Sequence, residues 1–183
     1  MKEPHPSSPP SSAPRAPSSL SGGRRAGAKG EQLRVDVIRR VRAWAPSART
    51  ISRWAAAALG RRARGAELAV RVVGPAESRR LNARFRGRDK PTNVLSFPGP
   101  LLPVPARGVA LPLGDLVICP KVLETEAREQ GKTLRAHWAH LVVHGVLHLV
   151  GYDHEREADA RRMERREIDV LRRLGFPNPY RSA

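Results

Sequence analysis

Three histidines in one apolar stretch constrain this chain more than any other feature. His144 and His148 are four residues apart, so on a helix they share one face and can direct their rings at a common point. Gly151 tolerates the left-handed backbone that ends a helix, which would let the chain turn back and bring His154 to the same point. Three imidazoles leave the fourth position of a tetrahedral ion open, the pattern of catalytic zinc. The sequence therefore predicts one Zn²⁺ per chain, bound by these three histidines.

The frame His-x-x-x-His-x-x-Gly-x-x-His is also that of the metzincin proteases. Those proteases carry their general base, a Glu, at the position that Gly145 occupies here. The sequence thus keeps the metal ligands and lacks a residue that a peptidase needs, which predicts a different substrate. The competing interpretation is a buried helix with incidental histidines, and it requires a separate partner for each imidazole.

Composition limits the number of domains and the compartment. With 183 residues, of which 40% are hydrophobic, the chain can bury the core of one domain. No stretch approaches the roughly 20 apolar residues of a membrane span, and the N-terminus has no apolar signal core. Cys119 is the single cysteine and ends an apolar run, so we predict a core residue and no disulfide framework. These features predict a cytoplasmic protein that does not bind membranes.

The net charge of +17 is concentrated in the first part of the predicted domain. Residues 31–107 hold 17 Lys and Arg against 5 Asp and Glu, whereas residues 108–183, which hold the three histidines, have 12 against 11. The alternative explanation of this positive charge is a general compositional bias, since 29 of the 34 basic residues are Arg. Because phosphate neutralisation supplies most non-specific nucleic-acid affinity, the asymmetry predicts a nucleic acid that reaches from the basic region to the metal.

The order of the elements predicts the fold class. Residues 1–30 are rich in Pro and Ser and are predicted to be a disordered basic tail, followed by a catalytic domain over 31–183. We predict an α+β fold, a single small domain with a four-stranded mixed sheet and about five helices. The strands are expected at 33–38, 68–73, 94–97 and 113–119, the helices at 47–62, 75–85, 120–130, 134–150 and 155–174, and a Pro-rich loop at 98–112.

Two predicted helices carry further side chains near the metal. His137 and His140 precede the motif on its helix, and we predict that they are core residues or support the ligands. The last helix is expected to turn four apolar residues inward, Met163, Ile168, Leu171 and Leu174.

A cationic turn follows the second helix. Arg84, Arg86, Arg88 and Lys90 place four cations within seven positions, around a Gly and before a Pro. Arginine adds a bidentate fork that suits phosphate, so these four residues are predicted RNA contacts.

Three segments together resemble the YbeY family of bacterial endoribonucleases, over about residues 32–180. They are 86–98 (RGRDKPTNVLSFP), 114–119 (GDLVIC) and 137–154, which ends in the histidine motif. The resemblance implies a zinc-dependent, single-strand-specific RNA hydrolase that matures ribosomal RNA, notably the 3′ end of small-subunit rRNA, and acts in ribosome quality control. It also implies ribosomal subunits as partners, His144, His148 and His154 as ligands, and Arg86 beside the site.

Zinc lowers the pKa of its water from near 16 to about 7, which would supply hydroxide to attack a phosphorus. We expect His144, as a ligand, and Arg86, which would neutralise charge on the phosphoryl oxygens, to act directly in catalysis. No residue is an evident general base: Asp153 is the nearest acidic candidate, with an orienting or turn role as its alternative. Attack by the RNA 2′-hydroxyl is the alternative to hydroxide.

Two rival functions remain open from the sequence. One is a metallopeptidase. The other is a non-catalytic ribosome-assembly factor with a structural zinc, which needs a fourth protein ligand such as Cys119 or His140.

Overall fold

The strands form where apolar and polar residues alternate. In β2, buried and half-buried residues alternate along the whole strand, as expected when one face of a sheet packs against helices. The computed structural model describes residues 32–100, 110–153 and 156–181. In these residues it has four strands, β1 (Arg34–Arg39), β2 (Ala66–Val72), β3 (Val94–Pro98) and β4 (Leu111–Ile118).

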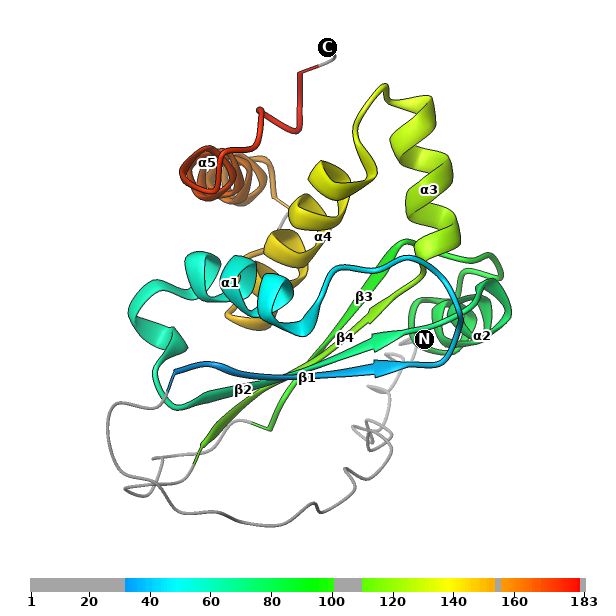
Figure 1. Ribbon diagram of the computed structural model, residues 1–183, viewed down its shortest axis with the longest axis horizontal. Helices are drawn as coiled ribbons and strands as arrows, with labels where there is room; N and C mark the ends of the chain where they lie inside the picture. Colours follow the sequence, from blue (N-terminus) through cyan, green and yellow to red (C-terminus); the bar gives the residue numbers. More distant parts are fainter. Residues whose placement is uncertain (1–31, 101–109, 154–155, 182–183) are drawn as a thin grey trace, which may run out of the picture.

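The four strands form one mixed sheet in the order β1-β2-β4-β3 (Figure 1). β1, β2 and β4 are parallel, and β3 runs antiparallel to β4 at the edge. The predicted α+β class and the mixed four-stranded sheet are confirmed.

The helices begin at residues suited to a first turn. Thr133 accepts a hydrogen bond from the Ala136 amide at 3.2 Å and caps the helix that carries the histidines. Pro75 and Pro120 each open a helix. The described residues form α1 (Ala48–Leu59), the short 3₁₀ helix η1 (Gly60–Ala63), α2 (Pro75–Arg86), α3 (Pro120–Glu129), α4 (Leu134–Leu149) and α5 (Glu157–Arg173).

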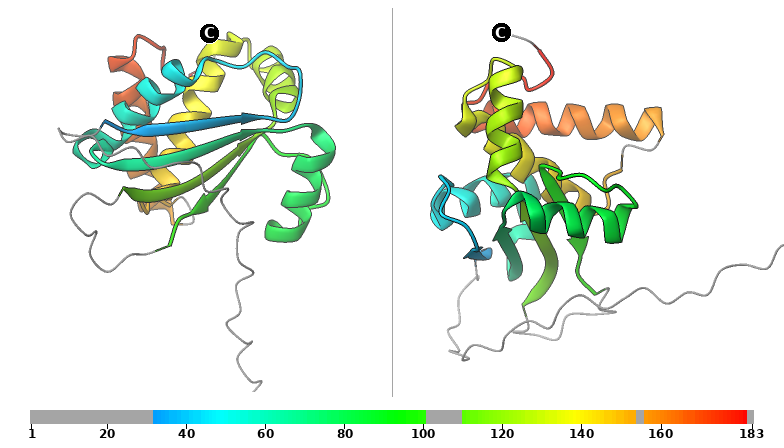
Figure 2. Two further views of the ribbon diagram at one scale, coloured as in Figure 1. Left: turned by 60° about the horizontal axis from the view of Figure 1, so that its bottom comes forward. Right: turned by 90° about the vertical axis from the view of Figure 1, so that its right-hand side faces the viewer.

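The main core lies between the sheet and the helices α1 and α4 (Figure 1). α4 contacts the sheet, α1, α3 and α5, which explains why most of its residues are apolar around the whole helix. A smaller cluster on the other face of the sheet joins Val73, Leu95 and Val117 to Leu81 of α2. α2 and α5 extend toward the same side of the molecule (Figure 2, right), so α4 lies at the base of a region between them.

Several boundaries differ from the prediction: β2 begins at Ala66 instead of residue 68, and α1 ends at Leu59, where η1 follows. β4 begins at Leu111, within the expected 98–112 loop, because Leu111 and Pro112 pair with Ala66 and Glu67 of β2. Tertiary pairing thus extends a strand into a segment whose composition favours a loop. Residues 101–109 and the predicted tail lie outside the described residues. No helix in the described part of the chain is both long and apolar enough to cross a membrane.

Candidate metal centre

His144 and His148 lie one turn apart on α4, and their side chains meet. Their Nε2 atoms are 3.2 Å apart, and their ring centroids are 4.6 Å apart at 79°. Two ligands of a tetrahedral zinc ion with bonds of 2.0–2.1 Å are about 3.3 Å apart. The pair therefore fits two adjacent positions of such an ion. His154, the third predicted ligand, lies outside the described residues.

A buried carboxylate of α5 supports this pair from behind. Glu167 is fully buried and accepts hydrogen bonds from His144 Nδ1 at 2.8 Å and from His140 Nε2 at 2.9 Å. The Tyr180 hydroxyl donates a third hydrogen bond to it. Burial raises the pKa of Glu167, but the hydrogen bonds from His140 and His144 outweigh this and bring it down to about 2. Glu167 is therefore ionised at neutral pH, and its oxygens can only accept hydrogen bonds.

The carboxylate determines which nitrogen of His144 carries the proton. Because ionised Glu167 can only accept, Nδ1 of His144 holds the proton and Nε2 holds the lone pair, on the side of His148. A carboxylate behind a ligand histidine is the arrangement that orients the ring and increases its basicity in zinc proteins.

A second ligand set is present in the same cluster. His140, His144 and Glu167 offer atoms that all lie within 4.8 Å of one another, the grouping among the described residues that could hold a metal. In that arrangement His144 would bind through Nδ1, whereas the three-histidine arrangement uses Nε2. The two sets share only His144. His148 belongs to the first set alone and His140 to the second alone, which makes the sets separable by mutation.

The position of Gly145 bears on the peptidase alternative. Gly145 is buried against the sheet: a Cβ atom there would lie 2.7 Å from Leu116 Cδ2 and 3.2 Å from Ser96 Oγ. Ser96 also donates a hydrogen bond to the Gly145 carbonyl at 3.2 Å. A glutamate at this position would point into the sheet, so the general base of a peptidase has no room here.

The four cations of the predicted RNA contact are exposed. Arg84 and Arg86 lie in the last turn of α2, and Arg88 and Lys90 on the loop that follows. Arg84 stacks over the Phe85 ring at 5.3 Å. No hydrogen bond or ion pair within the described residues connects these four cations to the histidines.

The loop that carries Arg88 and Lys90 is held in place by buried polar residues. Asn82 donates to the Lys90 carbonyl at 2.8 Å, and the Ser78 hydroxyl donates to the Thr92 carbonyl at 2.8 Å. Asn93, at the end of the loop, donates to Glu126, which also bonds His137 Nε2 at 2.7 Å. The loop is therefore tied to α4 through α3.

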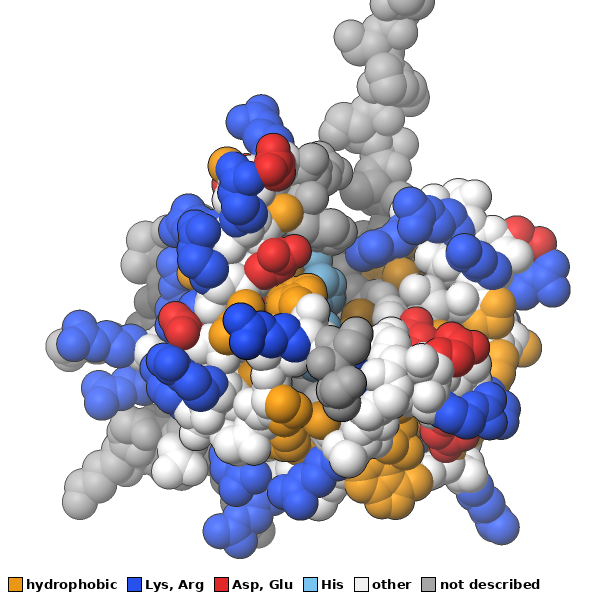
Figure 3. Space-filling view, turned by 90° about the horizontal axis from the view of Figure 1, so that it is seen from above, with side chains coloured by type: hydrophobic (Ala, Val, Ile, Leu, Met, Phe, Trp, Pro, Cys, Tyr) orange, Lys and Arg blue, Asp and Glu red, His pale blue; other side chains and the backbone are white. Residues whose placement is uncertain are grey.

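A histidine side chain is visible in a hollow of the surface. Figure 3 shows it at the bottom of a depression, with Lys and Arg as well as Asp and Glu side chains around it.

Comparison with known proteins assigns a family. The family model described as "Endoribonuclease YbeY" matches residues 38–175, about three quarters of the chain. The chain belongs to the YbeY family. "Endoribonuclease YbeY" of Halorhodospira halophila (strain DSM 244 / SL1) is 53% identical over 137 residues, which cover 74% of this chain and 88% of that protein. A solution structure of TM1509 from Thermotoga maritima is similar at a TM-score of 0.49 and 23% identity, covering 80% of this chain and 99% of that chain.

The residues that the YbeY family model matches include most of the polar side chains around the histidine pair. His140, His144, His148 and Glu167 fall within the matched residues, whereas Tyr180 lies beyond their end. The hydrogen bond from Tyr180 to Glu167 thus joins a segment outside the family match to its centre.

Sequence reasoning missed Glu167, although a signal for it exists. Of the four residues expected to turn inward on the last helix, Met163 and Leu171 are buried, while Ile168 and Leu174 are half-buried. Glu167 is four residues from both buried members, so an acid interrupts the apolar face of an amphipathic helix. An acid in that position needs buried partners, and the histidines of α4 are the residues able to provide them.

Proposed function

We propose that this chain is a zinc-dependent, single-strand-specific endoribonuclease of the YbeY family that acts in ribosomal RNA processing. By the family resemblance, its substrate is ribosomal RNA, in particular the 3′ end of small-subunit rRNA, its partners are ribosomal subunits, and it also serves ribosome quality control. The observation that carries the enzymatic part is the histidine pair with facing Nε2 atoms, backed by an ionised carboxylate, in a chain of an endoribonuclease family.

In this proposal His144, His148 and His154 hold the zinc. When bound, zinc acts as a Lewis acid toward a phosphoryl oxygen and makes water more acidic. In the neutral imidazole of His144, Glu167 keeps the proton on Nδ1, which leaves Nε2 as the ligand atom. We favour this set over His140, His144 and Glu167 because Glu167 also accepts a hydrogen bond from Tyr180, and because a carboxylate behind a ligand histidine is a supporting group in zinc sites.

The cations of the α2 turn bind the RNA backbone. Arg86 stabilises charge on the phosphoryl group that is cleaved, and Arg84, Arg88 and Lys90 hold neighbouring phosphates. Their exposure suits contact with an external polyanion.

The rival functions have less support. A peptidase lacks its base, since Gly145 packs on the sheet. A closed structural site would need Cys119 or His140 as a fourth ligand. Cys119 is buried at the start of α3 and is not in the metal-capable group of the described residues, and His140 is hydrogen-bonded to Glu167.

The test compares substrates and two histidine variants. The zinc-loaded protein is incubated with single-stranded RNA, double-stranded RNA and an unstructured peptide, and only single-stranded RNA should be cut. His148→Ala should lose zinc and cleavage, whereas His140→Ala should retain zinc. Peptide hydrolysis, or full cleavage of RNA by His148→Ala, would contradict the proposal. Loss of zinc in His140→Ala, with retention in His148→Ala, would show that His140, His144 and Glu167 bind the metal instead.

A further inference from the structure

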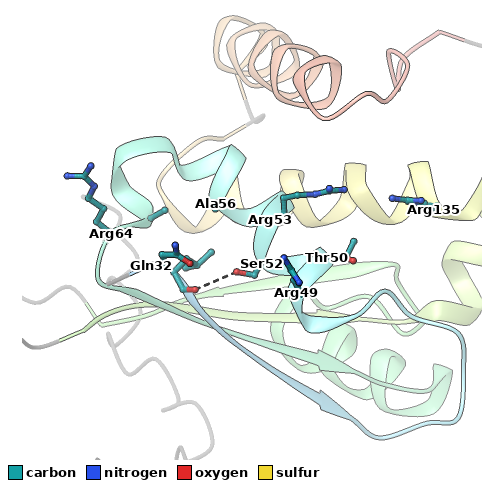
Figure 4. A pocket seen from close by; sticks show the side chains of 10 residues that line it. Gln32, Arg49, Thr50, Ser52, Arg53, Ala56, Arg64 and Arg135 are labelled. Atoms are coloured by element: carbon teal, nitrogen blue, oxygen red, sulfur yellow. Dashed lines mark hydrogen bonds between the residues drawn. The ribbon is translucent and has the colours of Figure 1, made fainter. Parts of the chain in front are cut away.

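A cavity of about 760 Å³ lies away from the histidine cluster, between the start of β1, the outer face of α1, η1 and the first turn of α4 (Figure 4). Among the described residues that line it, four are arginines and none is acidic. The arginines are Arg49, Arg53, Arg64 and Arg135. The neutral polar residues of the lining, Gln32, Thr50 and Ser52, add hydrogen-bonding groups.

The four guanidinium groups have no anionic partner within the described residues. Elsewhere on the surface, arginines pair with acids, as Arg34 does with Glu67 and Arg79 with Asp89. In Figure 4 the side chains of Arg53 and Arg135, which come from different helices, extend toward one another. Like charges that converge without a counter-charge repel each other, and an anion between them removes that cost.

The N-termini of α1 and α4 also favour an anion in this cavity. Arg49 and Arg135 are each the second residue of a helix, and neither α1 nor α4 has an acid in its first turn. The amide groups of a helix N-terminus carry partial positive charge, which disfavours a cation and favours an anion there. Two helix starts and four arginines thus direct positive potential to one cavity.

We infer that this cavity binds the phosphate backbone of RNA outside the cleavage site. Arg135 and His144 are nine residues apart on α4, about 13 Å along the helix axis at 1.5 Å per residue. One phosphate cannot reach both places, so the cavity holds a different part of the strand from the part that is cut. This inference rests on the proposed function, because it takes RNA as the polyanion.

The test measures binding of poly(U) as a function of salt. Arg53→Gln/Arg135→Gln should weaken binding roughly 10-fold at about 0.1 M salt and reduce the slope of log K against log salt by about 1.4, the value for two phosphate contacts to a single strand. Arg53→Lys/Arg135→Lys should keep most of the affinity, because the charges remain. Cleavage of saturating poly(U) should stay at the wild-type rate, since neither residue belongs to the metal cluster.

The matched control is Arg40→Gln/Arg42→Gln. These two exposed arginines follow the other end of β1, and their replacement changes the net charge equally. If both double variants weaken binding to the same extent, the effect is one of overall charge and the inference is overturned. It is also overturned if the Arg53/Arg135 variant keeps poly(U) binding and loses binding to polyglutamate, which would identify an acidic protein as the partner. Absence of any cleavage by the wild-type protein would instead refute the proposed function, whatever the binding result.

Discussion

At the scale of single residues, Glu167 connects three side chains around the proposed metal. It accepts hydrogen bonds from His140, His144 and Tyr180, and these come from α4 and the C-terminal segment. Because two of the donors are imidazoles, the carboxylate defines the tautomers of two histidines at once.

Glu167→Gln should weaken zinc binding about 10- to 100-fold, because a neutral amide no longer favours the proton on His144 Nδ1. The variant keeps the size of the buried side chain, so the protein should stay folded. Competition with a chelator measures the zinc affinity. Tyr180→Phe, which removes one hydrogen bond and leaves the carboxylate charged, is the control and should have the smaller effect. Equal zinc affinity of Glu167→Gln and the wild type would show that the carboxylate does not support the ligand.

Arg86→Ala should reduce single-turnover cleavage of single-stranded RNA by about 100-fold, roughly 3 kcal/mol of lost transition-state stabilisation. Zinc content and fold should be unchanged, since Arg86 is exposed at the end of α2. Arg86→Lys should recover only part of the rate, because an ammonium group cannot form the bidentate fork. Arg80→Ala, an exposed arginine on the same helix, is the matched control. A wild-type rate for Arg86→Ala would remove this residue from the mechanism.

At the scale of elements, α4 is fixed on one side by the sheet and on the other by α3 and α5. The sheet contact depends on Gly145, and the α3 contact on Glu126 with His137 and Asn93. Both contacts determine where the histidines of α4 lie, although Gly145 and Glu126 are not ligands of the proposed metal.

Gly145→Ala should destabilise the protein by about 1 kcal/mol, because the free-energy cost of overpacking against Leu116 exceeds the free-energy gain from the higher helix propensity of Ala. Gly145→Glu should cost more than about 3 kcal/mol, since a carboxylate would be buried on the sheet without a partner. Denaturant unfolding measures both. If Gly145→Glu is as stable as the wild type, position 145 faces the cleft, and the argument against a peptidase fails.

Glu126→Gln should reduce the free energy of unfolding by about 1–2 kcal/mol at neutral pH. Burial raises the pKa of Glu126, but hydrogen bonds from His137 and Asn93, with the charge of His140, outweigh it and lower the pKa. A lowered pKa stabilises the native state above the ordinary carboxyl range, and this contribution is lost as pH falls through the native-state value. Unfolding curves across the acidic range should therefore converge for the variant and the wild type. Glu124→Gln on the same helix is the control, and an equal, pH-independent effect of both variants would contradict this role.

At the scale of the whole molecule, the sequence predicts the architecture better than the centre of the site. Periodicity and turn residues predict the four strands and five helices because each element obeys a local pattern, whereas β4 starts early because its partner strand extends it. The close approach of the His144 and His148 side chains follows from helix geometry alone. The contact between α5 and α4 does not, since Glu167 lies 23 residues from His144 in sequence, and so Glu167 was missed. Tyr180, which follows α5 and bonds Glu167 from 13 residues away, was missed as well.

The most direct test of the central claim is RNA cleavage before and after removal of zinc. Chelation should abolish single-turnover cleavage of single-stranded RNA by the wild-type protein, and one equivalent of zinc per chain should restore it. The same zinc addition should not restore cleavage by His148→Ala. Undiminished cleavage by the metal-free wild-type protein would contradict the account.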